Sequence, residues 1–243
     1  MALEITSARP DPALFDLPWS SPLEEWPAHH LAALPRGISR HVVRFVKLSG
    51  GVIAVKEIKA ELASREYGVL RRLGKVDLPC VTPVGVVTGR VDALGDPLDA
   101  CLITRHLKFS LPYRALYSQA LRPDTAARLI DALAVLLVKL HLEGFWWGDV
   151  SLSNTLFRRD AGAFAAYLVD AETGELHPQL SDGQRAHDLE IARINIAGEL
   201  MDLQAGGFLE EHTDPVETAT EIVRRYHSLW AELTGVERFE TGD

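Results

Sequence analysis

The stretch WWGDVSLSNTLF, residues 146–157, constrains the fold of this chain more than any other part of the sequence. It sets the carboxylate of Asp149 and the amide of Asn154 among two tryptophans, two leucines and a phenylalanine. An unpartnered carboxylate in apolar surroundings is costly. The fold must therefore supply partners for these two side chains, or a site that uses them.

A long apolar helix is predicted directly before this stretch. Asp124 is suited to cap its N-terminus, and Gly144 is suited to end it. Apolar residues lie on nearly all sides of this helix, which predicts deep burial. Beyond the quoted stretch, AAYLVD predicts a short strand ending at Asp170, and helices are expected near 184–203 and 214–233. The second half of the chain is therefore predicted to be mainly helical.

Runs of β-branched residues dominate the first half of the chain. HVVRFVKL and GVIAVKEI, joined at Ser49 and its neighbouring glycines, predict an antiparallel hairpin. A helix over 60–74, ended by Gly74, follows, and strands are expected over 81–90 and 97–107. The first half is thus a small sheet with one helix, and the fold class is α+β.

The first 28 residues differ from the rest of the chain in being rich in proline. Five prolines occur there among apolar anchors such as Trp19 and Trp26. Proline disrupts a helix interior. Residues 1–28 are therefore predicted to form an extended arm that lies on a surface.

Charge and cysteine content narrow the class of protein. A net charge of -9 argues against a generic nucleic-acid binder, which needs excess Lys and Arg for phosphate contacts. Cys80 and Cys101 make no disulfide framework, so a reducing cytoplasm is expected. The N-terminus lacks a signal-peptide pattern, and Asp131 and Lys139 interrupt the longest apolar stretch, which predicts no membrane span.

Lys56 is an unusual residue for its position. Strand alternation places it on one face with Ala54 and other apolar residues. In the next helix, Glu66 shares the inward face with leucines and a valine. We expect Glu66 to pair with Lys56, because buried charges are normally paired. The pair is either purely structural or positioned to bind phosphate oxygens. Alternatively, Lys56 forms no pair: its aliphatic chain packs in the protein and its ammonium group extends to solvent.

Three oxygen-bearing side chains are expected to converge in the second half. Asp149 and Asn154 lie in one loop, and Asp170 lies at the end of the following apolar strand. Two such segments side by side would bind a hard cation, and Mg²⁺ typically takes one or two carboxylates plus substrate phosphates.

In this order, these features resemble the signature set of protein-kinase-like proteins. IAVK is similar to the strand motif V-A-I-K, REYGVLRRL resembles the helix that bears the paired glutamate, and GDVSLSN has the D-x-x-x-x-N spacing of the catalytic loop. The resemblance covers roughly residues 35–200. It implies a bilobal kinase-like fold, with a small antiparallel-sheet N-lobe and one helix over 29–107 and a mainly helical C-lobe over 108–243.

The resemblance also implies the catalytic and metal-binding residues. Asp149 would take the proton of the accepting hydroxyl, Lys56 would hold nucleotide phosphates, and Glu66 would fix Lys56. Asn154 and Asp170 would bind Mg²⁺, so ATP and Mg²⁺ are the implied cofactors.

Further residues would contact the nucleotide. Ala54 and Leu156 correspond to positions that face the adenine. The phosphate loop corresponds to LPRGISRH, in which only Gly37 is kept from the glycine-rich pattern. Backbone N–H groups from Gly37 through Ser39 to Arg40 would cradle the phosphates.

Several positions differ from the motifs of ordinary protein kinases, and these differences indicate a narrower family. Trp147 and Gly148 replace the His and Arg of the ordinary protein-kinase loop, Ser151 replaces a Lys, DAETG stands in place of D-F-G, and no A-P-E segment occurs. The chain is therefore more similar to the compact atypical bacterial kinases of the lipopolysaccharide kinase (Kdo/WaaP, InaA-like) families than to eukaryotic-type protein kinases.

Some residues leave alternatives open. The resemblance implies that Asp188 supports the backbone of the catalytic loop, whereas simple helix capping is the alternative. Trp146 and Trp147 would either stack on a sugar or pack the loop against the preceding helix. The nine histidines show no metal-ligand spacing and are interpreted as surface or structural residues.

The function that the resemblance implies is that of an atypical kinase, which transfers the γ-phosphoryl group of ATP to a hydroxyl of a small molecule, sugar, lipid or protein. Two alternatives stay open at this point. The degenerate phosphate loop is also consistent with a pseudokinase or scaffold, and nucleotidyl transfer would use the same site.

Overall fold

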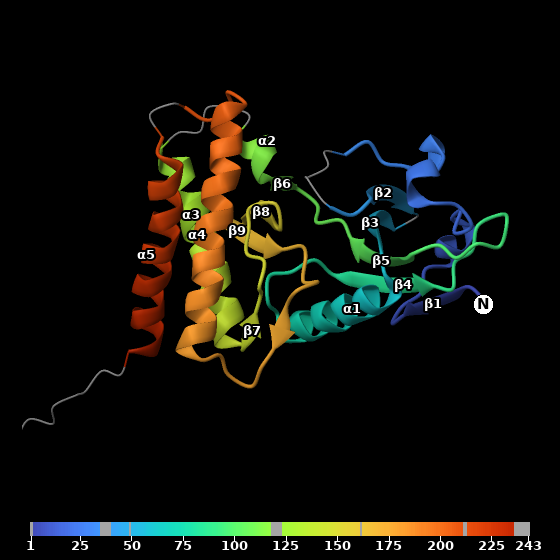
Figure 1. Ribbon diagram of the computed structural model, residues 1–243, viewed down its shortest axis with the longest axis horizontal. Coiled ribbons are helices and arrows are strands. Elements are labelled where there is room, and N and C mark those ends of the chain that lie inside the picture. The colour runs from blue at the N-terminus through green and yellow to red at the C-terminus, as the bar shows by residue number, and fades with distance from the viewer. Residues whose placement is uncertain are drawn as a thin grey trace, which may run out of the picture.

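The computed structural model describes residues 2–34, 40–48, 50–117, 123–160, 162–210 and 213–235. Figure 1 shows two lobes, one built around a sheet with the long helix α1 and one built around the long helices α3, α4 and α5. The chain passes between the lobes after strand β5. The predicted α+β class and the kinase-like division into a sheet lobe and a helical lobe are both present.

The N-lobe is a five-stranded sheet in which every neighbouring pair is antiparallel, with the order β1-β4-β5-β3-β2. Its strands are β1 (Glu4–Ser7), β2 (Val43–Leu48), β3 (Gly51–Ile58), β4 (Pro83–Thr88) and β5 (Ala100–Arg105), and helix α1 (Ala60–Lys75) contacts β4 and β5. The predicted β2–β3 hairpin forms, with Val43 opposite Lys56. Alternation along β3 turns Lys56 to the α1 side and Val55 to the opposite side.

The proline-rich N-terminal segment contributes to this sheet. Strand β1 pairs with β4, and three 3₁₀ helices follow at Pro12–Asp16, Leu23–Glu25 and Ala28–His30. Proline keeps these turns short, while Leu14, Trp19, Leu23 and Trp26 are buried against the sheet face opposite α1. The segment therefore covers the sheet face opposite α1, and it adds a strand that the sequence patterns did not indicate.

The predicted end of α1 at Gly74 is wrong by a small margin. The helix continues to Lys75, and Asp77 adopts the left-handed conformation with φ 54°. The N–H of Leu78 then donates to the carbonyl of Leu73 at 3.2 Å. Aspartate tolerates this conformation better than most residues, so the turn needs no glycine.

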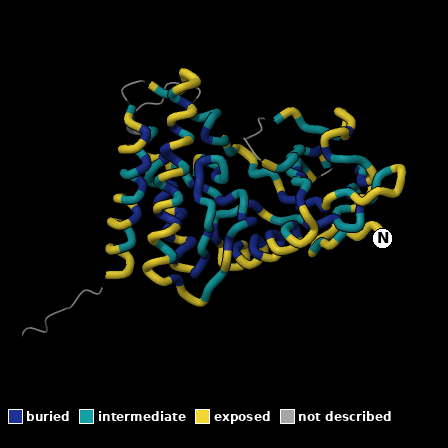
Figure 2. Tube along the Cα trace, viewed as in Figure 1, coloured by how far each residue is buried: buried dark blue, intermediate teal, exposed yellow. Residues whose placement is uncertain are grey.

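The C-lobe consists of helices around two small sheets. The helices are α2 (Tyr113–Tyr117), α3 (Pro123–Leu142), α4 (Asp182–Ala205) and α5 (Pro215–Thr234), and the strands are β6 (Ser110–Pro112), β7 (Phe145–Trp146), β8 (Thr155–Asp160), β9 (Ala163–Leu168) and β10 (Glu175–Leu176). The sheets have the orders β6-β8-β9 and β10-β7. Helix α5 packs on both α3 and α4 (Figure 1), and α3 is deeply buried, as predicted (Figure 2).

Among the residues that the structure describes, backbone hydrogen bonds join Leu168 of the C-lobe to the segment before β4. The N–H of Val81 donates to the carbonyl of Leu168, and the N–H of Leu168 donates to the carbonyl of Pro79, both at 2.9 Å. Strand β9 is thereby tied to the segment that leads into β4, which places Asp170 beside the N-lobe. None of the helices in the described ranges combines the length and the hydropathy of a membrane-spanning segment.

Candidate active site

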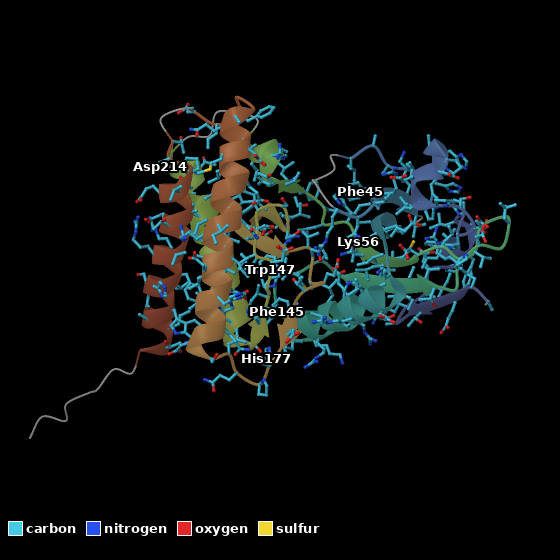
Figure 3. The ribbon with its side chains drawn as sticks, in the orientation of Figure 1. Phe45, Lys56, Phe145, Trp147, His177 and Asp214 are labelled. Carbon is cyan, nitrogen blue, oxygen red and sulfur yellow. The ribbon has the colours of Figure 1, made fainter. Side chains whose placement is uncertain are left out.

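Residues from both lobes line a cavity of about 710 Å³. Ala54 and Lys56 contribute from β3, and Asn154, Leu156 and Asp170 contribute from the C-lobe. Figure 3 shows Lys56 on the sheet lobe and Trp147 on the helical lobe. The cavity thus brings together residues that are separated by about half of the chain.

Lys56 is held by carboxylates at the inner end of this cavity. Its Nζ lies 2.7 Å from Glu66 Oε2, 3.1 Å from Asp170 Oδ2 and 3.6 Å from Glu172 Oε2. Burial lowers the pKa of Lys56, but the charges of Glu66 and Asp170 outweigh burial and raise it overall. Lys56 is therefore a firmly protonated ammonium, and the predicted pairing of Lys56 with Glu66 is confirmed.

Glu66 is the most deeply buried member of this group, with 1% of its side chain exposed. Burial raises its pKa to about 7, and the nearby charge of Asp170 acts in the same direction, while Lys56 opposes both. Its Oε1 accepts a hydrogen bond from the N–H of Ala171 at 3.2 Å. Glu66 consequently links α1 to the segment that carries Asp170.

Glu172 is a member of the site that the sequence analysis did not identify. Its carboxylate lies 2.9 Å from Nε2 of His41 and 3.4 Å from Nη2 of Arg40. Its N–H donates to Asp170 Oδ1 at 3.0 Å. The only signal in the sequence was a second acid two positions after Asp170. Glu172 connects the predicted phosphate-loop end at Arg40 to the predicted metal-binding segment.

Carboxylate oxygens of Glu66, Asp170 and Glu172 all lie within 4.8 Å of one another. Asp170 and Glu172 offer carboxylate oxygens beside Lys56, and oxygen donors suit hard cations. Asn154, which lines the same cavity, offers a further amide oxygen. The donor set therefore fits a Mg²⁺ ion.

The catalytic-loop residues Asp149 and Asn154 are partners of each other. Asn154 Nδ2 donates to the carboxylate of Asp149 and to its backbone carbonyl, both at 3.0 Å. Asn195 Nδ2, from α4, lies 3.4 Å from the other carboxylate oxygen of Asp149. These amides offset the cost of placing a carboxylate in an apolar stretch, which was the problem that the sequence posed.

Asp188 supports the start of this loop from inside α4. It is fully buried, and its oxygens accept hydrogen bonds from the N–H groups of Trp147 and Gly148, both at 2.7 Å. The capping alternative is wrong, because the N-cap of α4 is Ser181, which forms a capping box with Gln184.

A buried histidine and the two tryptophans also have structural partners. His141 Nε2 lies 3.2 Å from Asp188, and its Nδ1 lies 2.8 Å from the hydroxyl of Tyr226. Trp147 is fully buried and donates from Nε1 to the carbonyl of Asp170 at 2.9 Å. Trp147 thus packs the loop and joins it to the Asp170 segment, and Trp146 lies 5.7 Å from the ring of His187, centroid to centroid.

Only some of the other residues predicted to contact the nucleotide lie in the part of the chain that the structure describes. Ala54 and Leu156 line the cavity, as does Arg40. Gly37 and Ser39 lie outside the described residues. The structure therefore brings the predicted adenine wall and the Lys56 group into one cavity.

Comparison with known proteins decides the family. The profile of the lipopolysaccharide kinase (Kdo/WaaP) family matches residues 52–199, which is more than half of the chain. The chain belongs to this family. As a Kdo/WaaP-family protein it is an atypical kinase, and the matched range contains the whole Lys56 group and the catalytic loop.

A solved structure described as WaaP in complex with acyl carrier protein has the same fold. Its TM-score is 0.57 at 16% sequence identity, and the similarity covers 94% of this chain and 89% of that chain. At this identity the likeness concerns the fold alone. No curated protein sequence matches the chain.

Proposed function

We propose that this Kdo/WaaP-family kinase uses Mg²⁺ and ATP to transfer the γ-phosphoryl group to a hydroxyl of its acceptor. The observation that carries the proposal is the ion-pair group of Lys56, Glu66 and Asp170 on the wall of the same cavity as Asn154 and Leu156. A lysine held in this way presents a fixed positive charge to phosphate oxygens, and fixed charges supply most of the catalysis in phosphoryl transfer.

The nucleotide would lie between the lobes. Ala54 and Leu156 would contact the adenine, and the cavity is large enough for a nucleotide at about 710 Å³. Lys56 would bind phosphates while Glu66 keeps its ammonium in place. Arg40 would add a second cation, and the contribution of Gly37 and Ser39 stays a prediction from the sequence.

Asp170 and Asn154 would hold Mg²⁺, with Glu172 as a further carboxylate at the same end of the cavity. When bound, the ion would neutralise charge on the phosphates and orient them. Asp149 would accept the proton of the attacking hydroxyl. The side-chain amides of Asn154 and Asn195 would hold its carboxylate in a fixed orientation.

Membership of the Kdo/WaaP family supports a sugar acceptor. We assign it to the hydroxyl groups of a lipopolysaccharide-related sugar, with the reaction on the cytoplasmic side, where ATP is available. Residues 29–107 would close over the nucleotide and residues 108–243 would carry the acceptor side of the site.

Transfer from ATP radiolabelled at the γ-phosphate to purified lipopolysaccharide core tests this proposal. We expect wild-type protein to label the core in the presence of Mg²⁺. Asp149→Asn should lower the rate by about a hundredfold to ten-thousandfold, because it removes the base. Asp160→Asn, which alters a partly exposed carboxylate bonded to Arg158, is the matched control.

Two outcomes would point to the alternatives. Labelling from ATP carrying the label on the α-phosphate would indicate nucleotidyl transfer. Mg-ATP binding without transfer to any acceptor would indicate a scaffold. Binding is measured by thermal shift, where ATP at a hundred times its dissociation constant adds about 2.7 kcal/mol to the free energy of unfolding.

A further inference from the structure

Three polar side chains of α4 form one stripe facing the catalytic loop. Asp188, Asn195 and Glu199 are separated by seven and four residues, so they lie within about 40° of one another around the helix axis. The stripe spans about 16 Å along the axis at 1.5 Å per residue. It runs beside the loop from Trp147 to Ser153, and each of its three members bonds to a different part of that loop.

Glu199 holds the second half of the loop as Asp188 holds the first half. Its Oε2 accepts from the N–H of Leu152 at 2.7 Å, and its Oε1 accepts from the N–H of Ser153 at 2.9 Å and from the Ser153 hydroxyl. Burial raises the pKa of Glu199, and these loop donors oppose that rise. Two carboxylates on one helix therefore accept hydrogen bonds from four backbone N–H groups of the loop.

Asn195 lies between these two carboxylates and contacts the centre of the loop. Its Nδ2 donates to the carbonyl of Val150 at 3.1 Å and lies 3.4 Å from Asp149 Oδ1. Asn154 Nδ2 contacts the other oxygen, Oδ2, at 3.0 Å. The carboxylate of Asp149 is thus flanked by one amide from its own loop and one amide from α4.

We propose that Asn195 and Glu199 of α4 are positioning residues for Asp149, so that α4 acts as a template for the catalytic loop well beyond the contacts of Asp188. The loop has no regular secondary structure at residues 147–154, so its backbone groups need partners from elsewhere. The rigid helix supplies them at fixed spacing, which holds the loop and the Asp149 carboxylate together. The catalytic consequence rests on the proposed function, whereas the positioning itself does not.

Amide hydrogen exchange of the full chain tests the positioning directly. Glu199→Gln keeps the shape of the side chain but loses one carboxylate acceptor, so exchange at Leu152 and Ser153 should become about tenfold faster or more. Exchange at Trp147 and Gly148, which Asp188 holds, should stay unchanged. Glu190→Gln, on an exposed carboxylate of the same helix, is the matched control and should leave the whole loop unchanged.

Kinetics then separates positioning from a general structural role. Turnover of Mg-ATP is measured as ADP release with lipopolysaccharide core as acceptor. Asn195→Ala and Glu199→Gln should lower kcat by about tenfold or more, because small displacements of a catalytic group are costly. The KM for ATP should change less than twofold, because neither residue lines the cavity.

The outcomes are distinct. The proposal that α4 positions the loop would be wrong if amide exchange in the loop stayed unchanged in Glu199→Gln. It would also be wrong if both variants lost kcat and ATP affinity equally. Absence of turnover by wild-type protein would overturn the proposed function, and the exchange experiment would still decide whether α4 positions the loop.

Discussion

Lys56 Nζ and Glu66 Oε2 lie 2.7 Å apart at the junction of the sheet, helix α1 and the segment after β9. The pair is nearly closed to solvent, with 12% and 1% of the two side chains exposed. Asp170 shares the same ammonium at 3.1 Å. One cation therefore couples the position of α1 to the position of the predicted metal-binding segment.

Replacing Lys56 by methionine should weaken ATP binding by about tenfold or more while the fold stays intact. Methionine keeps the packing of the stem but removes the ammonium. The free energy of unfolding should fall by about 1–3 kcal/mol, less than for a fully buried pair, because Glu66 can take up a proton. Thermal-shift titration with Mg-ATP measures the binding, and urea unfolding measures the stability.

The double variant Lys56→Met/Glu66→Gln is the control for this prediction. It removes the uncompensated carboxylate and should recover most of the lost stability without recovering ATP affinity. Normal binding and turnover of ATP by Lys56→Met would contradict the role assigned to Lys56.

Asp188→Asn should destabilise the protein by about 3 kcal/mol. The asparagine keeps the shape but turns an NH₂ group toward a backbone N–H of Trp147 or Gly148, which leaves a buried donor unsatisfied. Urea unfolding is the measurement. Asp182→Asn lies on the same helix with its side chain 97% exposed and should change stability by no more than about 0.5 kcal/mol.

Gly144→Ala should destabilise the protein by at least about 2 kcal/mol. Gly144 ends α3 with φ +75°, and an added Cβ would lie 2.1 Å from the carbonyl oxygen of His177. Gly68→Ala is the opposite case, because an added Cβ at this position inside α1 meets no atom within 4 Å. It should raise stability by about 0.5–1 kcal/mol. Thermal unfolding of both variants checks the difference in sign.

Arg90→Met should weaken the contact between the N-terminal segment and the sheet and destabilise the protein. The fully buried guanidinium of Arg90 donates to Glu57 at 2.6 Å and to the carbonyls of Trp19 and Ser21 at 3.1 and 2.6 Å. Losing it removes one donor from a partly buried carboxylate and from the carbonyls of Trp19, Ser21 and Asp99, at a cost of about 3–5 kcal/mol. Arg193→Met removes a surface pair and should cost no more than about 1 kcal/mol in the same urea experiment.

Local patterns predicted much of the fold. The boundaries of β3 agree with the β-branched run from Gly51 to Ile58, because alternation and turn residues are encoded in neighbouring positions. The pairing of Lys56 with Glu66 was also predictable, since strand and helix periodicities each indicated an inward-facing charge. Strand β1 was not predicted, because its four residues, EITS, contain only one large apolar side chain and give too short an alternation to indicate a strand.

Local sequence patterns therefore predicted the α+β class and the residues that carry charge into apolar surroundings, and the family resemblance predicted the two lobes. Which distant side chains contact these charged residues depends on the packing of the whole chain. Glu172 reaches His41 across 131 positions, and Asn195 and Glu199 reach the catalytic loop across about 46. These contacts depend on how α4 and β9 pack, and a polar residue on a helix has the same local pattern whether it faces solvent or a loop.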